Sequence, residues 1–301
     1  MVNDAIQLSS EVDAALEARR PLVALETTLL AHGFPAETGL EVALDCERRV
    51  REAGAVPATI GVVDGAIVVG LSEDVLATFA SAGTEARKVG PRDLAACVVG
   101  GELGATTVGG TLAVCRAAGI GFMGTGGLGG VHRGWQQVPD ISGDLGELAR
   151  TEALVVASGA KSILDVAATA ELLETLGIPV LGYRTDTLPL FYSAEGGPPV
   201  SARIDSPGDA ARVALTHWRL GRRSAVVVAN PPPESVDVQS LIDEAVDAAR
   251  REGIAGQAVT PFVLARLHEA SEGRTIEVNR RLAAENAALA AEIAVAYADL
   301  D

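Results

Sequence analysis

Lys88 and Lys161 are the only lysines in a chain of 301 residues that contains 24 lysines and arginines in all. A buried lysine can lose its proton and act as a nucleophile, whereas the guanidinium of arginine stays protonated in proteins. Lys161 follows a short apolar run, Leu154–Ala157, within the segment Ser158–Asp165. Both positions are therefore candidates for amine chemistry, and the alternative is that two ordinary lysines persist there by chance.

Glu26 ends another apolar run, Leu22–Leu25, and is followed by two threonines. If this run is a strand of a parallel sheet, Glu26 lies at the carboxyl end, where such sheets bind ligands. Burial at that position raises the pKa of a carboxyl group and suits it to act as a general acid. The alternative is a glutamate on an edge strand that reaches solvent.

Two further segments have the composition of anion contacts. Gly104–Val108 has the pattern of a turn entering a helix with Thr106 or Thr107 as the N-cap, and amide groups at a helix start can bind an anion. Lys88 lies in the basic and polar segment Ala86–Asp93. A plain helix cap and a solvated loop are the alternatives.

The glycine-rich segment Gly124–Gly130 formally matches the G-x-G-x-x-G fingerprint of dinucleotide-binding proteins. That fingerprint requires a helix that opens at the third glycine, and Val131–Gln136 lacks helical periodicity, which argues against dinucleotide binding. Backbone amides freed by glycine can instead converge on a phosphate, with charge added by His132 and Arg133. The alternative is a glycine turn that lets a strand and a loop pack closely.

Asp140, Ser142 and Asp144 place oxygen ligands at alternate positions, a spacing that suits a hard cation such as Mg²⁺ or Mn²⁺. The same segment is also typical of a capping box, in which Asp144 caps a helix over Leu145–Thr151 and Glu147 is its partner. One segment can serve both purposes, with Asp140 on the metal and Asp144 at the helix start.

The overall composition is that of a globular protein, with 48% hydrophobic and 21% charged residues. The formal net charge of −16 argues against nucleic acid or an anionic membrane as a partner. An anionic ligand would therefore need cationic contacts that are gathered locally. No apolar run approaches the length that spans a bilayer.

The cysteines Cys46, Cys97 and Cys115 are odd in number and widely spaced. This pattern predicts buried thiols in a reducing compartment rather than a disulfide framework. The first twenty residues mix acidic side chains into a helical pattern and do not resemble a signal peptide. We therefore expect a cytoplasmic protein.

Short apolar runs alternate with amphipathic stretches, which predicts an α/β fold with a mostly parallel sheet. Asp64-Gly65 between two apolar runs predicts a tight hairpin, so part of the sheet is expected to be antiparallel. The predicted strands are Leu22–Glu26, Thr59–Val63, Ala66–Val69, Ala95–Val99, Gly119–Met123, Ala153–Ala157, Pro179–Gly182 and Ser224–Ala229. The predicted helices between them are Glu37–Ala53, Ser72–Ala80, Thr107–Ala118, Ser162–Leu176 and Asp209–Leu220.

After Asn230 the pattern becomes helical, with helices expected over Gln239–Glu252, Thr260–Ser271 and about Thr275 to Leu300. No break in composition marks a linker, and no internal repeat occurs. We therefore predict that residues 1–301 form a single domain with a helical C-terminal region.

Taken together, these segments resemble the pseudouridine-5′-phosphate glycosidase family, which also includes the indigoidine synthase A-like proteins. The resemblance spans nearly the whole chain, with its motifs in the expected order. The matching segments are Ala24–Thr28, His32–Pro35, Gly54–Ile60, Gly104–Val108, Thr125–Gly134, Asp140–Ser142, Ser158–Asp165, Gly182–Asp186 and Ala229–Pro231.

This resemblance implies an α/β/α sandwich, usually a homotrimer, that uses a divalent metal, most often Mn²⁺. It implies reversible cleavage of pseudouridine 5′-phosphate to uracil and ribose 5-phosphate. Glu26 matches the proton donor of the family, Lys161 its nucleophile and Asp140 its metal ligand. The positions that match substrate contacts or pocket residues are Lys88, Thr107, Val108, Thr125, His132, Ser142, Gly143, Asp144 and Asn279.

The chemistry of such a substrate fits the two lysines. A C–C glycosidic bond has no heteroatom on the base side to protonate, so a two-carboxylate glycosidase scheme suits it poorly. Opening the ribose ring and forming an imine at C1′ supplies an electron sink, and this requires an amine. A Schiff-base aldolase or lyase acting on another sugar phosphate is the alternative, because it would share Lys161 and the phosphate contacts.

Overall fold

The carboxyl ends of the parallel strands meet along one edge of a large twisted sheet. The computed structural model describes residues 5–254 and 259–300. Within these residues, eleven strands form one sheet in the order β1-β4-β3-β2-β7-β8-β11-β9-β10, and β6 joins β3 to β5. The strands are β1 (Ile6–Leu8), β2 (Leu22–Glu26), β3 (Val56–Val63), β4 (Ala66–Val69), β5 (Arg87–Val89), β6 (Gly104–Thr106), β7 (Phe122–Gly124), β8 (Leu154–Ala157), β9 (Val180–Tyr183), β10 (Ala202–Ile204) and β11 (Val226–Ala229).

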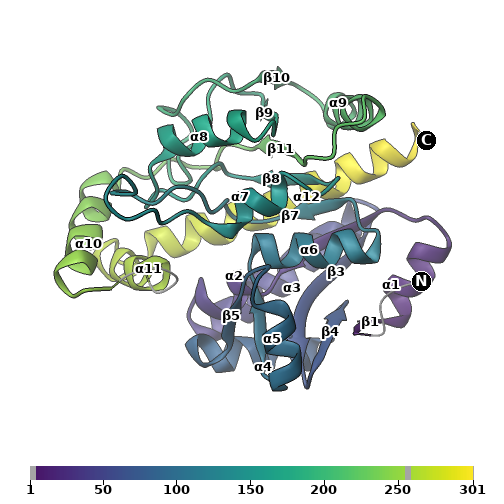
Figure 1. Ribbon diagram of the computed structural model, residues 1–301, viewed down its shortest axis with the longest axis horizontal. Coiled ribbons are helices and arrows are strands. Elements are labelled where there is room, and N and C mark those ends of the chain that lie inside the picture. Colours follow the sequence, from purple (N-terminus) through teal and green to yellow (C-terminus); the bar gives the residue numbers. More distant parts are fainter. Residues whose placement is uncertain (1–4, 255–258, 301) are drawn as a thin grey trace.

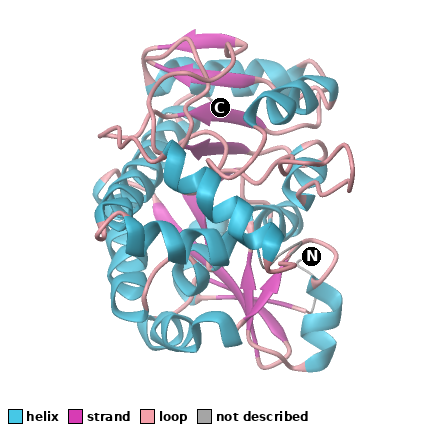
Figure 2. Cartoon of the chain, turned by 90° about the vertical axis from the view of Figure 1, so that its left-hand side faces the viewer, coloured by secondary structure: helices cyan, strands magenta, loops and turns pink. Residues whose placement is uncertain are grey.

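Strand pairing in this sheet is parallel except where β3 meets β4 and β6. The predicted hairpin at Asp64-Gly65 is confirmed, since both residues have positive φ and connect the antiparallel pair β3–β4. Figure 2 shows the twist, because the strands at the top of the view run across it while those at the bottom run steeply.

Helices cover both faces of the sheet, which confirms the predicted α/β/α arrangement. In β8, Leu154 and Val156 pack on one face, while Val155 and Ala157 pack on the other. The helices are α1 (Ser10–Glu17), α2 (Thr28–His32), α3 (Ala36–Glu52), α4 (Glu73–Ala82), α5 (Leu94–Gly100), α6 (Val108–Ala118), α7 (Gly143–Leu148), α8 (Val166–Thr175), α9 (Pro207–Arg219), α10 (Gln239–Arg251), α11 (Val259–Ala270) and α12 (Arg274–Ala298), with a 3₁₀ turn at Gly83–Glu85.

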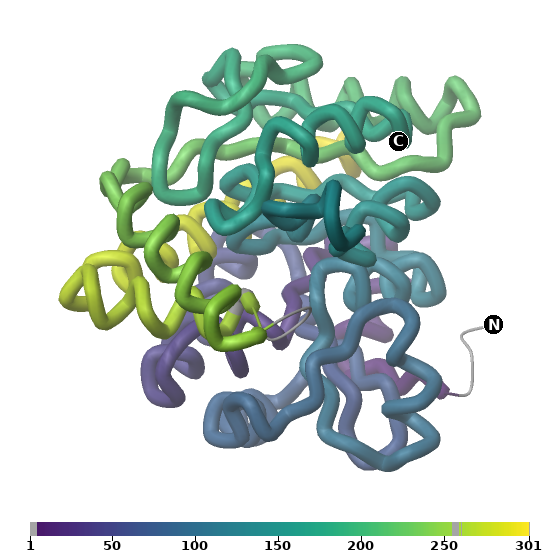
Figure 3. The backbone as a smooth tube through the Cα atoms, turned by 60° about the vertical axis from the view of Figure 1, so that its left-hand side comes forward, coloured from purple at the N-terminus to yellow at the C-terminus, as the bar shows by residue number. Residues whose placement is uncertain are grey.

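The C-terminal helix α12 runs along the middle of one face, where it packs on β2, β7, β8, α3 and α9 (Figure 1). Helices α10 and α11, green to yellow in Figure 3, lie to one side of the molecule next to segments from the start of the chain. Among the described residues, no helix combines the length and the apolar character needed to cross a membrane.

The predicted strand Ala95–Val99 is wrong, because this segment lies in helix α5. Cys97 is buried, whereas Ala95, Ala96 and Val99 are exposed, so the run is apolar without being a core strand. A short apolar run cannot be assigned to strand or helix from periodicity alone. The strands β1, β5, β6 and β10 were not predicted, and each is only three residues long.

The close approach of α12 to β7 depends on Gly124. A Cβ atom at this position would lie 2.8 Å from the Cα atom of Ala287 and 3.2 Å from the carbonyl oxygen of Asn286. Both are backbone atoms of α12, which cannot move aside as a flexible side chain would. The end of β7 is therefore fixed against the helix that covers it.

Gly124→Ala is expected to destabilise the protein by about 1–3 kcal/mol, because the added methyl group overpacks the contact between β7 and α12. Gly121→Ala is the matched control, since a Cβ atom there meets nothing within 4 Å. The free energy of unfolding from urea titration should change by less than about 0.5 kcal/mol in this control. Equal stability of the two variants would contradict the proposed contact.

Candidate active site

Two adjoining cavities open at the carboxyl edge of the sheet, and they share the side chains of Thr28, Lys88 and Lys161. The first is the smaller and has a mostly apolar wall; the second is larger, and about half of its wall is polar. Besides the shared residues, the first is lined by Glu26, Leu29, His32, Gly33, Gly127, Ser162, Ile163, Phe191, Pro261, Leu264 and Asn279. The second is lined chiefly by Thr107, Gly129, His132, Asp140, Ser142, Gly143 and Asp144.

Glu26 is the last residue of β2, an interior strand between β3 and β7, and its side chain is 7% exposed. The prediction of a carboxyl group at the strand end is confirmed, and the edge-strand alternative is wrong. Burial raises the pKa of Glu26, while the Lys161 ammonium and a hydrogen bond from the Thr125 hydroxyl partly oppose this. The group is therefore a stronger candidate for proton donation at neutral pH than an exposed glutamate.

Lys161 stands at the end of a turn that follows β8. Its backbone N–H donates to the carbonyl of Leu128 at 3.0 Å, which ties the turn to the glycine-rich segment. Gly159 within the turn has φ +77°, and a Cβ atom there would lie 1.9 Å from the carbonyl oxygen of Pro189. Only glycine fits this position, and the turn that it permits places Lys161 in both cavities.

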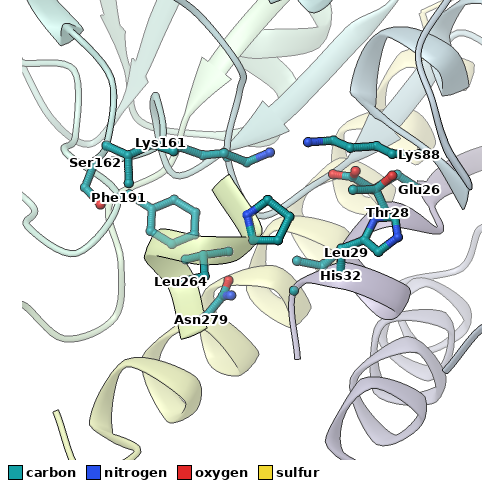
Figure 4. A pocket seen from close by; sticks show the side chains of 14 residues that line it. Glu26, Thr28, Leu29, His32, Lys88, Lys161, Ser162, Phe191, Leu264 and Asn279 are labelled. Atoms are coloured by element: carbon teal, nitrogen blue, oxygen red, sulfur yellow. The ribbon is translucent and has the colours of Figure 1, made fainter. Parts of the chain in front are cut away.

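The side chains of Lys88 and Lys161 reach toward one another from opposite walls, with Glu26 close to Lys88 (Figure 4). Lys88 lies in β5, a strand that pairs with β6. Burial and the positive charge of Lys161 lower the pKa of Lys88 to about 8, against the opposing effect of Asp144, Glu26 and Asp140. The two predicted amine positions are thus brought together in one site.

The start of α6 faces the second cavity. Thr107 is the N-cap, as predicted, and its hydroxyl accepts the N–H of Gly110 at 3.1 Å. Val108 is the first residue of the helix, and its side chain is buried in the core. Of Val108, therefore, the backbone rather than the side chain is placed to serve a ligand.

Asp144 has a different role from the predicted helix cap. The N-cap of α7 is Ser142, whose hydroxyl accepts the N–H of Asp144 at 3.2 Å. Asp144 is buried, and its two carboxylate oxygens accept the N–H groups of Gly109 at 2.8 Å and Gly129 at 2.9 Å. The predicted capping box is therefore wrong, and Asp144 joins the start of α6 to the glycine-rich segment.

The glycine-rich segment does not form a dinucleotide-binding turn, because the described chain continues from Gly130 to Ser142 without a helix. Its glycines permit close packing. A Cβ atom at Gly127 would lie 2.6 Å from the ring of Phe191, and one at Gly129 would lie 2.4 Å from the Ser142 hydroxyl. Since Gly127 and Gly129 also line the cavities, the close-packing interpretation explains the shape of the pocket wall.

Asp140 and His132 lie side by side in the second cavity, with Nδ1 of His132 3.9 Å from a carboxylate oxygen of Asp140. Burial lowers the pKa of His132, and the negative charge of Asp140 opposes this. Among the described residues, no three His, Cys, Asp or Glu side chains are grouped as a metal site. Of the predicted oxygen ligands Asp140 and Asp144, Asp140 is the one whose carboxylate remains available to a cation, since backbone amides bind both oxygens of Asp144.

Comparison with known proteins shows the family to which the chain belongs. A family model described as indigoidine synthase A like protein matches residues 11–296. The chain belongs to this family. Its relatives include the pseudouridine-5′-phosphate glycosidases of Herpetosiphon aurantiacus, 46% identical over 96% of this chain and 97% of the relative, and of Escherichia coli K12, 43% identical over 97% and 95%. The resemblance found in the sequence is thereby confirmed.

Two solved structures share the fold of this indigoidine synthase A-like chain. A prealnumycin C-glycosynthase, crystallised in complex with ribulose 5-phosphate, superposes with a TM-score of 0.89 at 42% identity and covers 99% of this chain and 98% of its own. An indigoidine synthase A-like protein from Thermotoga maritima gives 0.87 at 38% identity over 96% and 95%.

Asn286 is a site residue that the sequence analysis missed. This fully buried side chain of α12 donates to the carbonyl of Thr125 at 2.7 Å and to the hydroxyl of Ser158 at 3.1 Å. Its own carbonyl oxygen accepts from the side-chain amide of Asn230 at 3.0 Å. Asn286 thus holds together the ends of β7, β8 and β11. The signal in the sequence that could have identified it is an asparagine on the buried face of an alanine-rich helix.

The affinity for a sugar phosphate is expected to fall as the pH rises through about 8, because Lys88 loses its charge there. Calorimetry with ribitol 5-phosphate, which has no aldehyde to react with an amine, should show a loss of up to about tenfold per pH unit above that value. Lys88→Arg should abolish this decline, since a guanidinium stays protonated. If the affinity of the arginine variant falls with pH as steeply as that of the unaltered protein, a group other than Lys88 causes the fall.

Proposed function

We propose that this protein is a pseudouridine-5′-phosphate glycosidase, which reversibly converts pseudouridine 5′-phosphate to uracil and ribose 5-phosphate. The observation that supports this most directly is the convergence of two amines and one buried carboxyl group between an apolar and a polar cavity. Relatives named for this activity match nearly the full length of the chain. The related C-glycosynthase was crystallised with ribulose 5-phosphate, a pentulose phosphate, which agrees with a sugar-phosphate site.

In the proposed reaction, the amine of Lys161 attacks C1′ of the ribose and the bond from C1′ to the ring oxygen breaks. Glu26 gives its proton to the departing ring oxygen. The attacking nitrogen then gives its extra proton to the Glu26 carboxylate, and C5 of the base takes this proton from Glu26. The C1′–C5 bond breaks, its electron pair restores the C5–C6 double bond of uracil, and the nitrogen lone pair of Lys161 forms the imine at C1′. Water releases ribose 5-phosphate and regenerates the amine. An arginine could not replace Lys161 in this sequence, because the attacking nitrogen must have a free lone pair and a guanidinium stays protonated.

The two cavities suit the two halves of this substrate. The first offers apolar side chains to a flat base, together with the amide of Asn279, which is 1% exposed. The second offers Lys88, Thr107, His132 and the backbone at Val108 to the sugar and its phosphate. Thr125 contacts Glu26 rather than facing the larger cavity, so we assign it to the proton donor.

A divalent metal, with Mn²⁺ as the first candidate, would be held by Asp140 at the mouth of the second cavity. A hard cation with few protein ligands keeps several waters and takes substrate phosphate oxygens, and this agrees with one available carboxylate. When bound, it would supply positive charge that holds phosphate and water in place. Ser142 and Gly143 would contact the substrate beside it, because they line the same wall. The homotrimer and the cytoplasmic location implied above remain predictions.

Borohydride added during turnover with ribose 5-phosphate is expected to trap a secondary amine on Lys161, which peptide mass mapping would locate. Lys161→Arg should keep the positive charge and lower uracil release by roughly 10³-fold or more, since a guanidinium cannot form the imine. Adduct formation on Lys88, or near wild-type turnover of the arginine variant, would refute the assignment. A cleaved sugar in place of uracil would favour the aldolase alternative.

Exhaustive chelation is expected to abolish uracil release, and added Mn²⁺ should restore it. Asp140→Ala should be impaired under both conditions because it removes the carboxylate that remains available to the cation. Circular dichroism would verify that the variant is folded. Full activity after chelation would show that the metal is not required and would leave Asp140 without this role.

A further inference from the structure

Two side chains that line the apolar cavity each carry a buried polar atom that has no hydrogen-bond partner among the described residues: Nδ1 of His32 and Oδ1 of Asn279. Both side chains line the cavity that also contains Glu26 and the two lysines. Leaving a buried polar atom without a partner costs about 1–3 kcal/mol, so such atoms in a pocket indicate groups that a ligand satisfies. Asn279 already has a place in the proposed substrate contacts, whereas His32 has none.

The protonation pattern of His32 is fixed by its surroundings. Its Nε2 atom lies 2.9 Å from the carbonyl oxygen of Ala86, and because a carbonyl only accepts, Nε2 must donate. Burial lowers the pKa of His32, and the positive charge of Lys88 acts in the same direction, against hydrogen bonds to the carbonyls of Ala86 and Gly83. A neutral ring with its proton on Nε2 leaves a lone pair on Nδ1. His32 is therefore a hydrogen-bond acceptor in this cavity.

We infer that Nδ1 of His32 accepts a hydrogen bond from the N1–H group of the base and thereby selects C-linked over N-linked uridine phosphates. The inference rests on the proposed function. A uracil joined to ribose through C5 keeps both of its N–H groups, whereas one joined through N1 keeps only N3–H. An acceptor for the additional N–H favours the first compound, and it would remain without a partner beside the second.

The same contact acts on the proposed reaction. When C5 of the base takes its proton, positive charge develops at C6 and spreads to N1, which makes the N1–H group more acidic. A neutral acceptor at this position stabilises that charge, whereas a protonated histidine would repel it. His32 is therefore a specificity-determining residue that also favours departure of the base.

The test is a matched pair of substitutions in a Lys161→Ala background, which binds substrate without turnover. His32→Gln places an amide nitrogen where Nε2 donates to Ala86 and removes the acceptor at Nδ1. His32→Asn places a carbonyl oxygen near Nδ1 and gives up the contact with Ala86. Calorimetry would compare pseudouridine 5′-phosphate with its N1-methyl derivative, and ribitol 5-phosphate would serve as the ligand without a base.

The Lys161→Ala protein should bind the unmethylated nucleotide about tenfold more tightly than the methylated one, which corresponds to one hydrogen bond. Adding His32→Gln should bring the affinities for the two nucleotides within about twofold of each other, while adding His32→Asn should retain the preference for the unmethylated nucleotide. Ribitol 5-phosphate should bind equally well to Lys161→Ala and to the two double variants. A preference that persists in His32→Gln shows that the methyl group is rejected by shape alone and overturns the inference. An equal loss for ribitol 5-phosphate overturns it as well.

Failure of the proposed function is recognised separately, by the absence of uracil when the unaltered protein is incubated with pseudouridine 5′-phosphate. If the preference for the unmethylated nucleotide still depends on His32 in that case, the protein recognises the N1–H group of the base but does not cleave the glycosidic bond. Uracil release together with a preference that does not depend on His32 would retain the glycosidase and refute the role of His32.

Discussion

The gathering of one buried carboxyl group and two half-buried amines in one site is the constraint on which the rest of this site depends. Each group alone would lose its charge on leaving water, because desolvation disfavours the ionised form. Together they compensate one another, since the Lys161 charge opposes the rise in the pKa of Glu26, while Lys161 and burial lower that of Lys88. The result is a carboxyl group whose pKa is raised beside an amine, Lys88, whose pKa is lowered to about 8.

Such an arrangement requires side chains from distant segments to be held at fixed positions. A set of buried hydrogen bonds centred on Asn286 provides this. Asn286 binds the carbonyl of Thr125 and the hydroxyl of Ser158. The Thr125 hydroxyl in turn binds Glu26, and Ser158 opens the turn that leads to Lys161. A single buried amide on α12 therefore couples the position of Glu26 to that of Lys161. This explains why a helix with an otherwise alanine-rich face contains a fully buried polar residue.

The sequence predicted the parts of this structure that depend on local pattern. The strand Leu22–Glu26 was predicted with its observed ends, because an apolar run closed by a charged residue is a local signal. The roles of Asp144 and His32 could not be found in this way. Asp144 binds Gly109 and Gly129 from a different element, and the partner of His32 is a carbonyl 54 residues away. Spacing indicated that oxygen ligands occur at Asp140–Asp144, but only tertiary contacts show which of them are already used.

The contacts made by an arginine beside the site help to explain why lysine is scarce in this chain. Arg133, beside His132, donates to the carbonyls of Ser162 and Leu164 and to the carboxylate of Asp243, so it does not supply charge to the glycine-rich segment as predicted. Its planar fork of donors holds the chain directly after Lys161, at Ser162 and Leu164, a task that suits a permanently charged group with several fixed N–H directions. Lysine would be a poor brace there, and arginine would be an inert nucleophile at position 161. Arginine thus holds the backbone in place beside the site, whereas the two lysines place amines inside it.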